Sequence, residues 1–156
     1  MSNNKTSNAL HNSKKSYIYH ASKDPLLWVT IGDRLKQIAQ KYPENEALIT
    51  TWKNERYTYK QFYNLCKQAA KGLMQIGVKK GDKVGIWSTN NTQWVITQFA
   101  TAMIGSVLVT INPSLREHEF EYILKDSECQ SLVLLKEFKS SKYHHAKTMI
   151  KRYRNT

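Results

Sequence analysis

The side chains of this 156-residue sequence that are best suited to chemistry are its two cysteines and its histidines. Cys66 and Cys129 show neither CxxC spacing nor spacing to a histidine that would suggest a zinc site or a disulfide framework. The His118-Glu119 pair lacks the second histidine that a zinc-binding helix face needs. The adjacent His144-His145 would diverge by about 100° on a helix and make poor joint ligands. The sequence therefore predicts no metal site and no catalytic residue.

Phosphate-binding loops need glycines at fixed spacing, because only glycine lets backbone amides approach the phosphate closely. The glycines at 72, 77, 81, 85 and 105 match neither GxGxxG nor GxxxxGK[ST]. We therefore predict no nucleotide-phosphate loop and no bound cofactor in this chain.

Local patterns predict the elements that would position any site. Thr30 and Thr58 can cap helices whose apolar residues recur at helical spacing, and Gln61 completes a capping box with Thr58. Glycine follows two of the expected helices, at Gly77 and Gly105, as is common at helix ends. The expected helices start at Thr30, Thr58, Thr92 and Leu115, and the expected strands are Glu46–Thr51, Arg56–Thr58, Lys83–Ser88, Val107–Ile111 and Ser131–Leu135, before a basic final helix.

Helices and strands alternate from Thr58 onward, which predicts an α/β fold with a doubly wound, mainly parallel sheet and helices on both faces. The helix Thr92–Ile104 is apolar on nearly every side, and the run Val107–Ile111 is typical of a strand covered on both faces. Ligands of such sheets lie at the carboxyl ends of the strands. Candidate substrate-binding residues are therefore Asn90, Asn91 and Asn112, in the loops Ser88–Asn91 and Asn112–Ser114.

Charge suggests which partners to consider. The chain has 24 Lys and Arg against 12 Asp and Glu, a formal net charge of +12, so nucleic acid and anionic membrane are both conceivable partners. The segment Lys136–Arg154 combines basic and aromatic residues, a composition common in nucleic-acid-binding proteins. No recognised DNA or RNA module precedes it, and its apolar spacing favours an ordinary amphipathic helix with a solvated basic face.

The amino-terminal segment differs in composition from the rest. Residues 1–23 carry no acidic residue and no sustained apolar period, so we expect a flexible basic leader. It contains no arginine, which argues against a mitochondrial transit peptide, and we expect a cytoplasmic location with a mitochondrial one as the alternative. No run of about 18 apolar residues occurs, so no transmembrane segment is expected.

Several passages in order resemble the N-terminal part of AMP-forming acyl-CoA synthetases, the adenylate-forming enzymes that activate fatty acids. They are Thr30–Asp33, Tyr42–Leu48, Arg56–Tyr59, Gly72–Val84, Trp94–Gly105, Ile111–Pro113 and Glu119–Lys125. The resemblance spans roughly residues 17–140. It implies three segments: the leader 1–23, an N-terminal synthetase subdomain over 24–140, and a basic C-terminal helix or tail over 141–156.

The resemblance implies a two-step reaction of the full-length enzyme, with ATP, magnesium and coenzyme A. ATP and a fatty acid give an acyl-adenylate and pyrophosphate, and the thiol of coenzyme A then displaces AMP. In that family the phosphate loop, the adenine and ribose ligands and the catalytic lysine lie downstream of this region. The resemblance therefore transfers no catalytic residue here and does not indicate acyl chain length.

Two interpretations stay open. The chain is expected to be a scaffold fragment, inactive alone, that needs the remaining part of the synthetase as partner or self-associates through exposed apolar surface. Alternatively, it is a small basic interaction module that binds a protein partner or nucleic acid through Lys136–Arg154. We expect the first.

Overall fold

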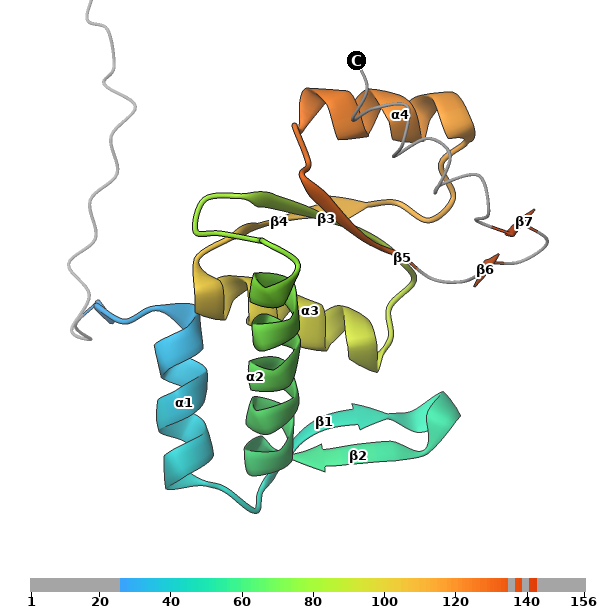
Figure 1. Cartoon of the computed structure of the whole chain (residues 1–156). Coiled ribbons are helices and arrows are strands. Elements are labelled where there is room, and N and C mark those ends of the chain that lie inside the picture. The colour runs from blue at the N-terminus through green and yellow to red at the C-terminus, as the bar shows by residue number, and fades with distance from the viewer. Residues whose placement is uncertain (1–25, 135–136, 139–140, 143–156) are drawn as a thin grey trace, which may run out of the picture.

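A computed structural model describes residues 26–134, 137–138 and 141–142 of the chain. Figure 1 shows a small sheet with helices on both sides of it. The elements are α1 (Ile31–Lys41), β1 (Glu46–Thr50), the 3-10 turn η1 (Thr51–Lys53), β2 (Glu55–Thr58), α2 (Tyr59–Gln75), β3 (Lys83–Trp87), α3 (Thr92–Ile104), β4 (Val107–Ile111), α4 (Glu117–Asp126), β5 (Ser131–Leu134), β6 (Glu137–Phe138) and β7 (Ser141–Lys142).

The predicted helix starts are confirmed for the first three helices, because their caps are local. The Thr30 hydroxyl accepts a hydrogen bond from the backbone N–H of Asp33 at 3.1 Å. Thr58 and Gln61 exchange both hydrogen bonds of a capping box at the start of α2. Gly105 ends α3 with φ of +69°, a left-handed conformation that glycine adopts without steric cost.

The central sheet has the order β4-β3-β5, and both pairings are parallel. This confirms the predicted α/β fold with a parallel sheet. The central position belongs to β3, whose residues 84–87 are all buried. The expectation that Val107–Ile111 is covered on both faces is met only in part: Ile111 is 3% exposed, but Val107 is 49% exposed and Thr110 is also exposed, because the packed helices cover this strand incompletely.

Successive residues of β3 serve opposite faces of the sheet, as the strand period of two requires. On one face α4 packs over a cluster that contains Trp87, Ile111 and Phe120. On the other face α2 and α3 pack over Val84. Helices thus cover both faces, with α4 on one side and α2 and α3 on the other (Figure 1).

The helix α1 and the hairpin β1-β2 form an outer part of the molecule, against α2 and α3. Their shared core is built on Leu35, Phe62 and Cys66, and the rings of Phe62 and Phe99 meet edge to face at 5.2 Å. The predicted hairpin is confirmed, with β1 and β2 antiparallel. The turn between them is a 3-10 helix that ends at Asn54 with φ of +52°.

Several boundaries differ from the expected ones: β1 ends at Thr50 instead of Thr51, and β3 ends at Trp87 instead of Ser88. β2 begins at Glu55 instead of Arg56, and α4 begins at Glu117 instead of Leu115. The basic final helix falls on positions most of which the structure does not describe; β6 and β7, just before them, form a small antiparallel pair. In the part of the chain that is described, no helix has the length and apolarity needed to cross a membrane.

Cys66 is expected to be an inert core thiol. It is fully buried in α2, and this burial raises the pKa of its thiol from 9.0 to about 12. We expect iodoacetamide at pH 8 to leave Cys66 unmodified in the folded chain and to alkylate it in urea. Cys66→Ser should lower the free energy of unfolding by about 1–3 kcal/mol, because a buried hydroxyl needs a partner.

The same burial gives a pH dependence. Because the pKa of Cys66 is higher in the folded than in the unfolded chain, its stabilising contribution is complete below pH 9 and falls as the pH rises toward 12. Urea unfolding at pH 8 and pH 10.5 measures this loss, and Cys66→Ala should show a smaller one. Rapid alkylation in the native state would contradict the burial.

Candidate functional site

The carboxyl ends of β3, β4 and β5 share one edge of the sheet. Trp87 pairs with Ile111 on one side and with Leu134 on the other, so the loops after these three residues leave the sheet together. In the sheet order β4-β3-β5, the chain passes from β3 to β4 on one side and then crosses to β5 on the other side. The strand order therefore switches between β3 and β5, and folds of this kind bind ligands at such a switch point. The loop with Asn90 and Asn91 therefore flanks this switch point, whereas Asn112 follows the strand on the other side.

Asn91 is a structural residue at this edge. It is 8% exposed, and its side-chain oxygen accepts a hydrogen bond from the Trp94 backbone N–H at 2.9 Å, which caps α3. Its amide nitrogen donates to the Ser88 hydroxyl and to the Thr89 carbonyl, both at 3.0 Å. Every strong hydrogen-bonding group of the Asn91 side chain thus has a partner within its own loop.

Asn112 is also used by its own turn, and Asn90 is not buried. The Asn112 side-chain oxygen accepts a hydrogen bond from the Ser114 N–H at 2.9 Å, and its backbone carbonyl accepts one from the Trp87 indole at 3.0 Å. Asn90 is exposed. Of the three asparagines selected from the sequence, Asn90 and Asn112 are both exposed at the strand ends, whereas Asn91 is buried.

A buried polar contact beside this edge was not predicted from the sequence. The Thr50 hydroxyl lies 2.7 Å from that of Thr92, which donates to the Glu55 carboxylate at 2.5 Å. Thr50 and Thr92 are 3% and 1% exposed. This contact joins both strands of the hairpin to the first turn of α3. No local signal indicates it, since the three residues come from separate elements.

No metal-ligating cluster accompanies the strand-end loops in the part of the chain that the structure describes. Among the described residues, no group of three His, Cys, Asp or Glu could hold a metal ion. His118 is exposed, and the Glu119 carboxylate accepts a hydrogen bond from the Arg116 N–H at 2.8 Å at the start of α4. This confirms the interpretation of both as helix-surface residues. His144 and His145 lie outside the described residues.

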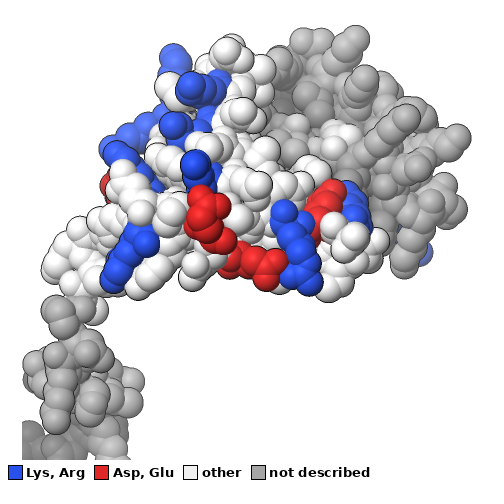
Figure 2. Space-filling view, turned by 90° about the horizontal axis from the view of Figure 1, so that it is seen from below, with Lys and Arg blue, Asp and Glu red and all other residues white. Residues whose placement is uncertain are grey.

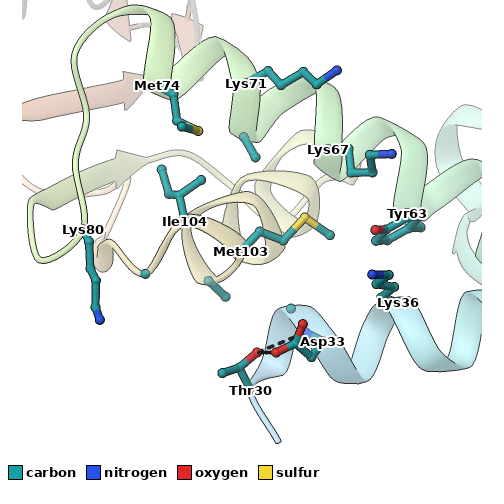
Figure 3. Close-up of a pocket in the computed structure, with 14 residues that line it drawn as sticks. Thr30, Asp33, Lys36, Tyr63, Lys67, Lys71, Met74, Lys80, Met103 and Ile104 are labelled. Atoms are coloured by element: carbon teal, nitrogen blue, oxygen red, sulfur yellow. Dashed lines mark hydrogen bonds between the residues drawn. The ribbon is translucent and has the colours of Figure 1, made fainter.

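A second feature is a groove of about 590 Å³ between α1, α2, the end of α3 and the turn before β3. Figure 3 shows Met74, Met103 and Ile104 at its apolar part, with lysine side chains around it. We call it the basic groove and define it by Lys36, Lys67, Lys71 and Lys80 with this apolar part. Sequence reasoning treated these lysines as solvated helix faces and missed that three elements bring them together.

The other basic feature singled out from the sequence, Lys136–Arg154, lies mostly outside the described residues. Its role as a binding segment stays a prediction.

Comparison with known proteins gives one family. Residues 35–154 match the model described as AMP-binding enzyme. The relative named "Putative acyl-CoA synthetase YngI" from Bacillus subtilis is 46% identical over 118 residues, which are 76% of this chain and 22% of that protein. The human protein named medium-chain acyl-CoA ligase ACSF2, mitochondrial, is 40% identical over 130 residues, which are 83% of this chain and 21% of that protein.

A solved structure agrees with the fold. The N-terminal domain of FACL13 from Mycobacterium tuberculosis superposes with a TM-score of 0.69 at 26% identity, over 82% of this chain and 31% of that chain. This chain spans about a fifth of the length of the curated relatives it matches.

Proposed function

Because the chain belongs to the AMP-binding enzyme family, as the N-terminal part of an acyl-CoA synthetase, we propose that it serves as scaffold for the formation of a fatty acyl-CoA. The whole enzyme would convert ATP, a fatty acid and coenzyme A into acyl-CoA, AMP and pyrophosphate. The observation that carries the proposal is the family match over residues 35–154. We propose fatty acids as the substrate class and leave the acyl chain length open.

The contribution of this chain is to position the strand ends. Asn91 fixes the turn between β3 and α3, and Asn112 fixes the turn after β4. The contact of Thr92 with Thr50 and Glu55 holds the start of α3 against the hairpin. We propose that Asn91 and Asn112 shape the loops that face substrate, and that the exposed side chains of Asn90 and Asn112 are the ones able to contact it.

A separate question is where ATP and magnesium would bind. Among the described residues there is no cluster of three acidic or other metal-ligating side chains. The side-chain oxygens of Asn91 and Asn112 already accept hydrogen bonds from nearby backbone N–H groups. We therefore derive no catalytic step from this chain and propose that ATP, magnesium and coenzyme A bind with the remaining part of the synthetase.

We expect the purified 156-residue chain to show no acyl-CoA synthetase activity. Adenylation depends on positioned charge around the phosphates and the carboxylate, and the family resemblance places the residues that supply it downstream of this region. Fatty-acid-dependent exchange of pyrophosphate into ATP measures the first half-reaction directly. The human ACSF2 enzyme in the same assay is the positive control. Exchange by the chain alone would contradict the proposed scaffold role.

The proposed scaffold role also suggests a cellular location and a partner. We propose a cytoplasmic or mitochondrial location, the second because the ACSF2 relatives are mitochondrial by name. The proposed partner is the remaining part of a synthetase.

A further inference from the structure

A row of large apolar side chains is exposed where the described chain begins. Leu26 is 80% exposed, Leu27 69% and Trp28 94%, and Ile31 in the first turn of α1 is 62% exposed. Isolated exposed apolar residues are ordinary, but four large ones within six positions form a patch. Such a patch is costly in water unless something covers it. We call it the apolar edge.

The apolar edge adjoins the basic groove. Thr30, Asp33 and Lys36 line the groove, and they also line a shallower depression whose walls include Trp28 and Val29. Figure 2 shows several Lys and Arg side chains on the side of the molecule where the described chain begins, with acidic side chains next to some of them. Apolar and cationic side chains therefore share one continuous face.

The groove lysines are not neutralised within the described part of the chain. The ion pairs found there are Arg56–Glu46, Lys83–Glu128 and Lys125–Glu121, and none includes a groove lysine. Asp33 is the one acidic residue that lines the groove, and its carboxylate accepts a hydrogen bond from the Thr30 hydroxyl at 2.7 Å. Lys67 lies 5.3 Å from the centre of the Tyr63 ring, a cation–π contact with a neutral partner, so the net charge of the groove is unchanged by it. The face therefore favours an anionic partner.

The chain itself does not provide that partner. Residues 1–25 contain four lysines and a single acidic residue, Asp24, and residues 143–156 contain Lys and Arg but no acidic residue. A second copy carries the same net charge of +12. Charge complementarity therefore excludes the chain's own remaining segments and a second copy as good occupants of this face.

We propose that the apolar edge and the basic groove together form a docking face for an anionic lipid bilayer surface. Tryptophan and leucine side chains partition into the boundary between headgroups and acyl chains, and lysines next to them attract anionic headgroups. Stable peripheral binding generally needs two such signals, and this face carries both. Each lysine near an anionic surface contributes about 1 kcal/mol, so the four groove lysines form a substantial electrostatic contribution. The proposal does not depend on the proposed role in fatty acyl-CoA formation.

The direct test is flotation of the 156-residue chain with vesicles. One set contains phosphatidylcholine alone, and the other contains phosphatidylcholine with about one third phosphatidylserine. We expect binding to the anionic vesicles, much weaker binding to the neutral ones, and a decrease as salt screens the lysines. Absence of binding to anionic vesicles at low salt would overturn the proposal.

Two charge-matched variants locate the binding face. The first changes three groove lysines, Lys36→Gln, Lys67→Gln and Lys71→Gln. The control variant makes the same change at Lys41, Lys53 and Lys125, which do not line the groove. We expect the first to bind anionic vesicles about 100-fold more weakly and the control much less so. If both variants lost the same vesicle affinity, the net charge of the chain alone would determine binding, and the assignment of this face would be overturned.

Two exposed tryptophans test the apolar half of the proposal. Trp28→Ser should weaken vesicle binding about tenfold and remove most of the blue shift of tryptophan fluorescence on binding. Trp52 is also exposed, at 67%, but it lies in η1 at the hairpin, so Trp52→Ser should leave both signals nearly unchanged. An unchanged blue shift in Trp28→Ser would contradict insertion of this edge.

Binding to other polyanions tests whether this face recognises a bilayer surface or negative charge in general. Single-stranded nucleic acid and polyglutamate are added at the same salt concentrations, with the same lysine variants. Lysine-dependent binding to either of these, combined with no binding to anionic vesicles, would replace the bilayer by a polyanion as the ligand of this face. Circular dichroism of each variant confirms that these exposed substitutions leave the fold intact.

Discussion

Phe120→Ala is expected to lower the free energy of unfolding by about 3–5 kcal/mol, the largest effect of any substitution considered. Phe120 is fully buried in α4, and its ring stacks on that of Trp87 with centroids 4.0 Å apart. Its removal leaves a cavity between α4 and the central strand and also removes the aromatic contact. Whole domains are stable by only about 5–15 kcal/mol, so the variant should be close to unfolding at 37 °C.

Urea unfolding followed by circular dichroism measures this loss. The matched control is Tyr122→Ala, two residues along the same helix, whose side chain is 67% exposed and which should change stability by less than about 0.5 kcal/mol. Equal and small effects of the two substitutions would show that α4 does not pack on the sheet as described.

Gly32→Leu is expected to destabilise the chain by about 1–3 kcal/mol, because α1 approaches α3 closely at this glycine. A Cβ atom at Gly32 would lie 3.0 Å from the Met103 Cα and 3.2 Å from its Cγ. The Cα belongs to the backbone of α3, so a whole helix would have to move. The larger leucine side chain makes the overlap worse.

Gly72→Ala is expected to have the opposite effect on stability. Gly72 lies inside α2, and a Cβ there would have no atom within 4 Å. This substitution should raise stability by about 0.4–1 kcal/mol, because alanine loses less backbone freedom on folding. Thermal unfolding of the two variants side by side measures the difference. A Gly32→Leu variant as stable as the wild type would contradict the close contact of α1 and α3.

The sequence predicts most element boundaries because the signals that set them are local. Thr30, Thr58 and Asn91 accept hydrogen bonds from residues three positions ahead, so the cap can be read from a short window. The expectation about β4 was met only in part for a different reason. A run of β-branched residues indicates a strand, but how completely its two faces are covered depends on helices that pack on it from elsewhere in the chain.

The position of the strand ends was predicted, whereas the hydrogen bonds of the asparagines there were not. The strand ends were located correctly, because parallel strands align their carboxyl ends, yet Asn91 and Asn112 turned out to stabilise their own turns. Thr50, Glu55 and Thr92 were missed since they meet only in three dimensions. The lysines of the basic groove were missed for the same reason.

The measurement that tests the proposed function most directly is a transplant into a complete synthetase. The matching segment of human ACSF2 is replaced by residues 17–140 of this chain, and acyl-CoA formation is measured with medium-chain fatty acids. A chimera that carries the matching segment of YngI is the control, because it shows whether human ACSF2 stays active with a related N-terminal segment. We predict that the chimera with this chain folds and forms acyl-CoA, and that adding Phe120→Ala abolishes this activity. A folded but inactive chimera, beside an active YngI transplant, would contradict the scaffold role.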